Sequence, residues 1–155
     1  MSKGFNTFEL SPSLQRGIAD RGYVEPRPIQ TQTIPALLEG RDVLGLAQTG
    51  TGKTAAFALP LLQRLLGGRR PGPRVLVLAP TRELATQITE EFKALARFTR
   101  IQVAVVFGGV SQRSQVNALN GDPEIVVACP GRLLDLLGQN LLRLDRVEAL
   151  VLDEA

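Results

Sequence analysis

The chain of 155 residues contains no histidine and no tryptophan, and Cys129 is its single cysteine. Without histidine, neither a histidine general base nor a histidine metal site can form. One cysteine excludes an internal disulfide and a cysteine zinc cluster. This usage is typical of a cytosolic protein, so we expect a cytoplasmic location.

Long apolar runs are also missing. The first ten residues, "MSKGFNTFEL", lack the apolar core of a signal peptide, and no run reaches membrane-spanning length. We therefore expect no membrane partner. The net charge is only +3, which by itself says little about nucleic acid. The hydrophobic fraction of 44% is enough for a buried core, and the length fits one domain.

Short apolar runs alternate with helical patterns along the chain. The runs are too apolar to be half exposed, which is typical of parallel strands covered on both faces. The alternation predicts a doubly wound α/β fold with a mostly parallel sheet and helices on both faces. The expected strands are 42–47, 74–80, 102–109, 124–130 and 148–154, and the expected helices between them are 52–66, 82–98, 111–120 and 131–139.

Residues 1–40 precede the first expected strand and form a separate helical segment, with helices predicted at 11–20 and 28–38. Residues 41–155 form the expected α/β domain. Within it, the stretch "GGRRPGPR" at 67–74 is predicted to be a loop whose two adjacent arginines face solvent.

Four of the five expected strands end in polar or Gly/Pro-rich sequence: "AQTG", "PTRE", "CPGR" and "DEA". In open α/β sheets, ligands bind outside the carboxyl ends of the strands. The functional residues are therefore expected at these strand ends.

The first of these ends is "AQTGTGKT" at 47–54, followed by a predicted helix. Strand, glycine-rich loop, lysine, threonine and helix are the parts of a phosphate-binding loop. The glycines let backbone N–H groups point at phosphate oxygens, Lys53 reaches the β- and γ-phosphates, and Thr54 offers a hydroxyl to Mg²⁺. Ala47 replaces the usual first glycine. The alternative is a glycine-rich turn that only caps a helix.

The last expected strand runs into Asp153 and Glu154. A phosphate loop needs an acidic group on a neighbouring strand to hold Mg²⁺ and another to orient the attacking water. Asp153 suits the metal and Glu154 the water. The alternative is an ordinary polar strand end.

Six motifs occur in a fixed order: "GYVEPRPIQ" (22–30), "AQTGTGKT", "PTRELA" (80–85), "GG" (108–109), "PGR" (130–132) and "LDEA" (152–155). Together they resemble the DEAD-box family of ATP-dependent RNA helicases, and the stretches "FGGVSQR" and "RLLDLL" resemble bacterial members of it. The resemblance implies the first of two RecA-like domains, with the end of that domain and the whole second RecA-like domain outside this chain. It implies RNA-stimulated ATP hydrolysis coupled to RNA unwinding or remodelling in the full-length protein, and nucleotide binding with negligible hydrolysis here.

The resemblance also implies an ATP site. Gln30 would read adenine through its amide, and Tyr23 would stack on the base or else pack between the N-terminal helices. Phe8 would support them or only pack. The implied ATP-binding residues are Phe8, Tyr23, Gln30, Thr49, Gly50, Thr51, Gly52, Lys53 and Thr54; the catalytic residues are Lys53, Asp153 and Glu154, and Thr54 and Asp153 would hold Mg²⁺, partly through water.

An RNA-binding face is implied as well. It would contact the sugar-phosphate backbone through helix starts and arginines, without reading sequence. Its residues are Pro80, Thr81, Arg82, Gly108, Gly109, Pro130, Gly131 and Arg132. The alternative for the arginines is structural: Arg82 could pair with Glu83, and Arg132 with Asp135.

Two positions depart from the family pattern. Arg27 stands where threonine is usual, and it could lie along the nucleotide or point to solvent. Cys129 replaces the threonine before "PGR". A thiol is a weak donor, so one phosphate contact is expected to weaken, and no histidine is present to activate it as a nucleophile.

Two rival functions remain at this point. One is an ATP-gated clamp that holds RNA without productive unwinding. The other is a DNA-directed or unrelated phosphate-loop ATPase, against which the "PTRELA" and "GYVEPRPIQ" motifs argue.

Overall fold

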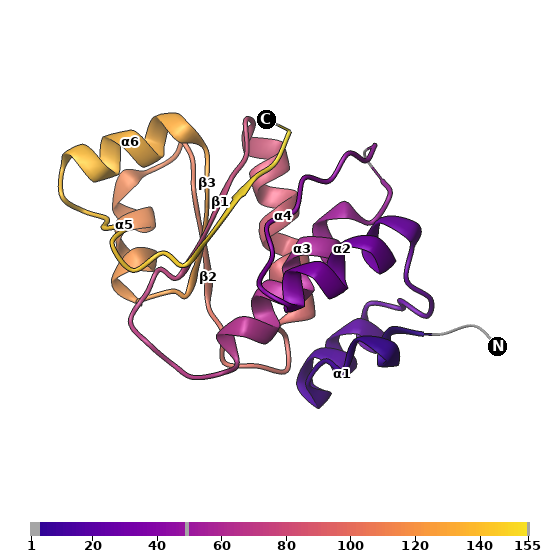
Figure 1. Cartoon of the computed structure of the whole chain (residues 1–155). Helices are drawn as coiled ribbons and strands as arrows, with labels where there is room; N and C mark the ends of the chain where they lie inside the picture. Colours follow the sequence, from indigo (N-terminus) through magenta and orange to yellow (C-terminus); the bar gives the residue numbers. More distant parts are fainter. Residues whose placement is uncertain (1–3, 49, 155) are drawn as a thin grey trace. The chain divides into compact units, whose positions relative to one another are not determined.

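The computed structural model describes residues 4–48 and 50–154 (Figure 1). The chain divides into two compact units. The first comprises Met1–Gly67 and Glu91–Arg100, and the second comprises Gly68–Glu90 and Ile101–Ala155. Thr49, one of the expected ATP-binding residues, lies outside the described residues.

The second unit contains a sheet of four strands in the order β2-β3-β1-β4. The strands are β1 (Val75–Leu78), β2 (Val103–Val106), β3 (Ile125–Ala128) and β4 (Ala149–Leu152). Every pairing is parallel: Leu78 lies beside Ala128 on β3 and beside Leu152 on β4. The carboxyl ends of all four strands therefore meet at one edge of the sheet, as the sequence predicts.

Two helices cover one face of this sheet, α5 (Gln112–Asn120) and α6 (Pro130–Gly138), as Figure 1 shows. Their apolar side chains pack with alternate strand residues, because successive strand side chains point to opposite faces. This core cluster includes Leu76, Val126 and Leu136. Full burial of one such side chain contributes about 1.5–3 kcal/mol.

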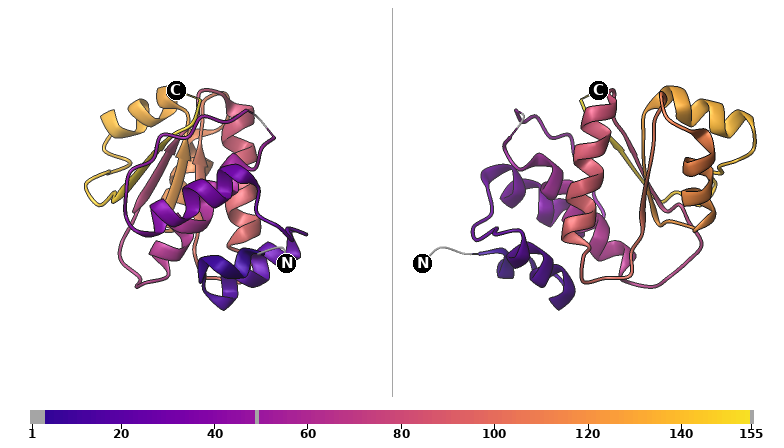
Figure 2. Two further views of the ribbon diagram at one scale, coloured as in Figure 1. Left: turned by 45° about the vertical axis from the view of Figure 1, so that its right-hand side comes forward. Right: turned by 180° about the vertical axis from the view of Figure 1, so that it is seen from behind.

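Helix α4 (Arg82–Leu95) follows β1, and its beginning lies on the opposite side of the sheet from α5 and α6 (Figure 2). Val75 and Val77, which alternate with the residues of the first core cluster along β1, are fully buried too. The sheet thus has helices on both faces, and the predicted doubly wound fold is confirmed for these strands.

The strand expected at 42–47 is wrong. Residues 41–48 form no strand, and Leu44 and Leu46 are each 88% exposed. A strand exists through the ladder of hydrogen bonds to a neighbour, and no described strand pairs with this segment. Apolar residues favour burial, but they do not by themselves provide the neighbouring strand that a β-strand needs for its hydrogen bonds.

The first unit is helical. It contains the short 3-10 helix η1 (Phe5–Phe8), α1 (Pro12–Asp20), α2 (Pro28–Leu38) and α3 (Lys53–Leu65), and α2 packs along α3. Both predicted N-terminal helices are confirmed, each with proline in its first turn, where a missing N–H costs nothing. Phe57 of α3 meets Phe92 near the end of α4, with ring centroids 6.0 Å apart.

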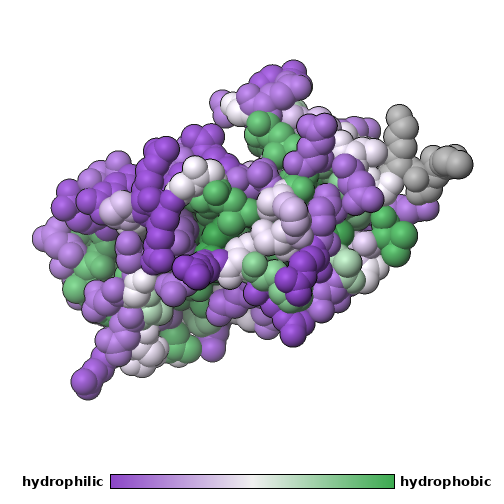
Figure 3. Space-filling model, turned by 90° about the horizontal axis from the view of Figure 1, so that it is seen from below, coloured by the Kyte–Doolittle hydropathy of each residue, from purple (hydrophilic) through white to green (hydrophobic). Residues whose placement is uncertain are grey.

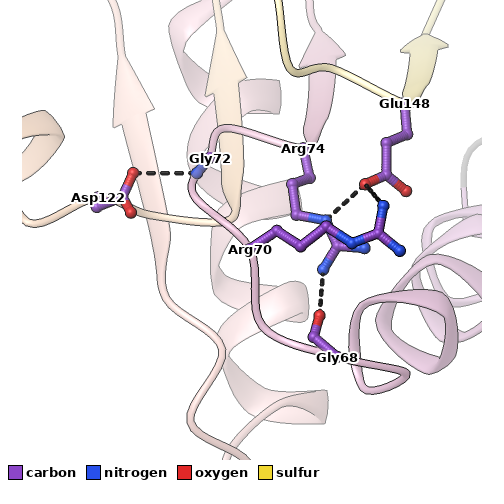
Figure 4. Close-up of polar contacts among 6 residues, drawn as sticks. All are labelled: Gly68, Arg70, Gly72, Arg74, Asp122 and Glu148. Carbon is purple, nitrogen blue, oxygen red and sulfur yellow. Dashed lines mark hydrogen bonds and ion pairs between the residues drawn. The ribbon is translucent and has the colours of Figure 1, made fainter.

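The loop at 67–74 ends in a buried ion pair (Figure 4). Arg74 is 3% exposed, and its Nε lies 2.6 Å from a carboxylate oxygen of Glu148, while its Nη1 donates to the carbonyl oxygen of Gly68 at 2.7 Å. The two arginines expected in solvent are indeed exposed: the side chains of Arg69 and Arg70 are 68% and 71% exposed and lie near Glu124 and Glu148. Arg74 therefore joins the starts of β1 and β4.

The face drawn in Figure 3 mixes hydrophilic and hydrophobic residues, and its apolar residues lie in separate patches. Among the described residues, none of the helices combines the length and the apolar character that crossing a membrane requires.

Candidate functional site

The glycine-rich loop leads directly into α3. Gly50 and Gly52 have φ of 85° and 82°, a left-handed conformation that glycine adopts without steric cost. Gly52 is the N-cap of α3, so Lys53 and Thr54 lie in the first turn. The N–H groups of a first helical turn have no partner within the helix and carry the positive end of its dipole. This local geometry suits an anion.

Gln30 contacts this loop from α2. Its side chain is 3% exposed, its amide oxygen accepts from the backbone N–H of Arg27 at 2.8 Å, and its amide nitrogen donates to the carbonyl oxygen of Gly52 at 3.0 Å. A Cβ at position 52 would lie 2.5 Å from that nitrogen. Only glycine therefore allows both the turn and the contact. The amide oxygen can accept a second bond and the nitrogen has a second hydrogen, so a role in reading adenine stays open.

Arg27 also contacts the loop. Its Nη1 donates to the carbonyl oxygen of Gly50 at 2.9 Å. Arg27 is exposed, and its guanidinium bonds to the loop. That it lies along a bound nucleotide stays a prediction. Arg27 and Gln30 thus bind two carbonyls of one glycine-rich turn.

Tyr23 is anchored inside the first unit. Its hydroxyl donates to Glu91 at 2.7 Å, and Arg21 donates to the same carboxylate at 2.6 Å. Burial raises the pKa of Tyr23, and the neighbouring carboxylate of Glu91 raises it further. The ring stacks on Phe5 with centroids 6.3 Å apart, and Phe8 meets the edge of Phe5 at 6.0 Å. Stacking of Tyr23 on adenine stays a prediction.

Phe5, which is 3% exposed, is the aromatic residue that the sequence analysis missed beside Tyr23. Both Phe5 and Phe8 lie on one short helix, and the sequence offers no periodic pattern around them to tell the buried ring from the half-buried one. The structure assigns the contact with Tyr23 to Phe5.

The acidic pair follows β4. The backbone N–H of Asp153 donates to the carbonyl oxygen of Leu78 at 3.0 Å, which extends the ladder with β1. The Asp153 side chain is buried, at 6% exposure, whereas Glu154 is exposed and has a φ of 53°. A buried carboxylate beside an exposed one matches a division between metal ligand and water-orienting group. That both act with residues 50–54 stays a prediction.

The "PTRELA" motif begins α4 at the end of β1. Pro80, Thr81 and Arg82 are all exposed. The Thr81 hydroxyl accepts from the backbone N–H of Leu84 at 3.2 Å and so caps the helix. The Arg82 guanidinium lies over the ring of Phe107, 4.8 Å from its centroid. In the described chain Arg82 makes this contact and not the alternative ion pair with Glu83.

The "GG" motif forms an exposed turn after β2. Gly109 has a φ of 82°, and a Cβ there would lie 3.2 Å from Nη1 of Arg82. Gly108 is exposed as well. A side chain at 109 would be strained and would crowd Arg82, so the turn requires glycine on two counts.

The "PGR" motif begins α6 at the end of β3, with Pro130 and Gly131 exposed. Arg132 donates from Nη1 to the side-chain oxygen of Gln115 at 3.0 Å and from Nη2 to the carbonyl oxygen of Val110 at 3.3 Å. These contacts take the place of the alternative ion pair with Asp135. All three RNA-binding motifs of the sequence analysis therefore lie within the second unit, at one edge of one sheet.

Cys129 precedes them as the N-cap residue of α6, where its side chain makes no capping hydrogen bond. Burial raises the pKa of its thiol, and the negative charge of Glu83 raises it further. At neutral pH the group is a protonated thiol, which is a poor nucleophile.

Comparison with known proteins agrees with this architecture. Residues 27–155 match the family profile described as DEAD/DEAH box helicase. The chain is 48% identical over 97% of its length to the ATP-dependent RNA helicase SrmB of Haemophilus influenzae, of which it covers 35%. It is 51% identical over 97% of its length to the ATP-dependent RNA helicase DeaD of Buchnera aphidicola subsp. Schizaphis graminum, of which it covers 25%.

A crystal structure of the RNA helicase Prp28 from Chaetomium thermophilum bound to ADP has a similar fold. It superposes with a TM-score of 0.91 at 40% identity, over 98% of this chain and 38% of that one. This chain spans only about a quarter to a third of the length of the SrmB and DeaD relatives.

The parallel sheet, the flanking helices and the motifs at its carboxyl edge define an α/β domain of the RecA-like class. The match over residues 27–155 then identifies the family, and the chain belongs to the DEAD/DEAH box helicases.

Proposed function

We propose that this chain is the ATP-binding, RNA-contacting first RecA-like domain of an ATP-dependent RNA helicase. The observation that carries the nucleotide part is the left-handed glycine turn at the start of α3, bound from outside by Gln30 and Arg27. Backbone N–H groups at the start of a helix carry the positive end of its dipole, which favours phosphate oxygens at this position.

Magnesium fits the donors that the chain offers. Mg²⁺ prefers oxygen ligands and retains several waters, so it needs only one or two protein groups. The Thr54 hydroxyl and the buried Asp153 carboxylate are donors of the right kind. When bound, the ion neutralises charge on the β- and γ-phosphates. Lys53 would bind the same phosphates, and Glu154 would orient a water for attack.

RNA binding is proposed for the edge formed by the starts of α4 and α6 and the "GG" turn. Pro80, Thr81, Arg82, Gly108, Gly109, Pro130 and Gly131 are all exposed there. Two helix starts and two arginines suit phosphate groups, which are contacted without regard to base sequence.

In the full-length protein, we propose that closure against a second RecA-like domain couples RNA-stimulated ATP hydrolysis to local unwinding or remodelling, in the cytoplasm. This chain alone is expected to bind adenine nucleotides and to hydrolyse them negligibly. A clamp that holds RNA without unwinding is the second candidate, since it needs the same residues, and an unwinding assay of the full-length protein separates the two.

The base-reading role is tested by replacing Gln30 with glutamate. A carboxylate cannot donate to Gly52 or to adenine, so Gln30→Glu should weaken ATP binding by roughly 5- to 150-fold, given about 1–3 kcal/mol for such an amide–adenine pair. The wild-type chain should prefer ATP to GTP. Calorimetric titration with both nucleotides measures this.

Gln32→Glu is the matched control, because Gln32 is exposed on the same helix and should bind ATP like the wild type. Equal affinity of the wild type for ATP and GTP would remove base reading from the proposal. Equal losses in Gln30→Glu and Gln32→Glu would assign the effect to added charge.

A further inference from the structure

Gln115 is a buried polar residue that none of the motifs includes. It lies on α5 and is 6% exposed. Its amide nitrogen donates to the carbonyl oxygen of Phe107 at 2.8 Å, and its amide oxygen accepts from Nη1 of Arg132 at 3.0 Å. Both ends of this buried amide are therefore satisfied, one by the residue next to the "GG" motif and the other by the arginine of the "PGR" motif.

The carbonyl groups on both sides of the "GG" turn accept hydrogen bonds from Gln115 or Arg132. Phe107 immediately precedes the glycines, and Val110, which follows them, accepts from Nη2 of Arg132 at 3.3 Å. Gln115 and Arg132 thus hold the carbonyls at both ends of the exposed turn. The Arg82 guanidinium stacks over Phe107 on the same turn.

We propose that Gln115 is a positioning residue for RNA: it fixes the orientation of Arg132 and the shape of the Gly108–Gly109 turn, so that both meet a phosphate together. The inference rests on the proposed RNA-binding function of this edge. Arg132 keeps further N–H donors that its two bonds do not use, and these remain available for a phosphate oxygen.

The physical effect is preorganisation. An arginine side chain that moves freely loses conformational freedom when it binds a phosphate, whereas Arg132 is already held by Gln115 and Val110. Loss of this restraint should weaken RNA binding by roughly two- to tenfold, the usual cost of immobilising one long side chain.

The test uses Gln115→Met, which keeps the length of the side chain and removes both hydrogen-bonding ends. Binding of a labelled single-stranded RNA is measured by fluorescence anisotropy at several salt concentrations. We expect a roughly two- to tenfold loss of affinity. The salt slope should fall too, by less than the value of about one expected for Arg132→Gln, because a mobile Arg132 occupies its phosphate contact only part of the time. A merely structural role would weaken binding without changing the slope.

A double variant separates positioning from independent effects. If Gln115 acts through Arg132, Gln115→Met combined with Arg132→Gln should bind RNA no more weakly than Arg132→Gln alone. Additive losses would overturn the inference. Should Gln115→Met fail to fold by circular dichroism, Gln115→Asn tests the same point, since its shorter side chain cannot reach both partners.

Gln112→Met is the matched control. Gln112 lies on the same helix but is only partly buried, and its side chain bonds to Gln139 and to neither Phe107 nor Arg132, so this variant should bind RNA like the wild type. If the wild type binds no RNA, the proposed function of this edge fails, and this inference with it. If the wild type binds RNA and the Gln115 variants match it in affinity and slope, this inference alone fails.

Discussion

Gln30, Arg27 and Gln115 use side-chain hydrogen bonds to hold backbone carbonyls of exposed glycine turns. Gln30 and Arg27 contact Gly52 and Gly50, and Gln115 contacts the residue before Gly108. Glycine turns have little stability of their own because glycine loses the most freedom on folding. Residues outside a glycine turn can therefore decide whether that turn keeps its shape.

Cys129 offers a prediction at the same scale. Since the thiolate is the reactive form and burial raises the pKa of this thiol, iodoacetamide should alkylate the folded chain more slowly than the urea-unfolded chain at neutral pH. The rate in the folded chain should rise with pH and level off only above about pH 8.5, the ordinary cysteine pKa. Mass spectrometry of quenched samples measures both rates.

The raised pKa of Cys129 also makes the stability of the folded chain depend on pH. A neutral thiol in the folded state contributes fully below the unfolded pKa, and this contribution is lost as pH rises through the folded value. Equal alkylation rates of Cys129 in the folded and unfolded chains at pH 7 would contradict a buried thiol with a raised pKa.

Some site residues could be predicted from sequence and others could not. Motif residues such as Gly52 and Arg132 are identified by type and spacing. Gln115 and Phe5 are not, because their roles depend on contacts with Arg132 and Tyr23 that only the fold creates. Arg27 shows a further limit: its guanidinium bonds to a loop carbonyl, an option that residue type alone does not suggest.

At the scale of elements, four of the five expected strands and all six expected helices are present. Periodicity and apolar runs predict them because each buries its own apolar side chains. The segment at 42–47 has the same composition and yet forms no strand. β4 is an edge strand, with Leu150 and Leu152 more than half exposed.

The buried ion pair of Arg74 and Glu148 is expected to hold the starts of β1 and β4 together. Glu148→Gln should lower the free energy of unfolding by about 2–3 kcal/mol, below the usual 3–5 for a broken buried pair, because the Glu148 side chain is 20% exposed. Urea denaturation followed by circular dichroism measures the change. Arg143→Ala, in an exposed pair with Asp145, is the control and should have little effect; similar losses in both variants would contradict the account.

At the scale of the whole molecule, each unit carries a share of the motifs. The first contains the glycine-rich loop, Gln30 and Tyr23, and the second contains the proposed RNA-binding edge and the acidic pair. Residues 54 and 153 lie far apart in the chain, so only the family resemblance predicts that both act on the same nucleotide. Their joint action on one nucleotide is the central claim.

The most direct measurement of that claim is the effect of Mg²⁺ on nucleotide affinity. ADP is titrated into the wild type, Asp153→Asn and Glu154→Gln by calorimetry, with magnesium and with a chelator. Glu154→Gln serves as the matched control, since a water-orienting group should not affect binding.

If the loop and Asp153 hold one magnesium nucleotide, Mg²⁺ should strengthen ADP binding in the wild type and in Glu154→Gln. In Asp153→Asn this strengthening should be largely lost, while affinity in the chelator is retained. An Asp153→Asn chain that responds to Mg²⁺ as the wild type does would contradict the account.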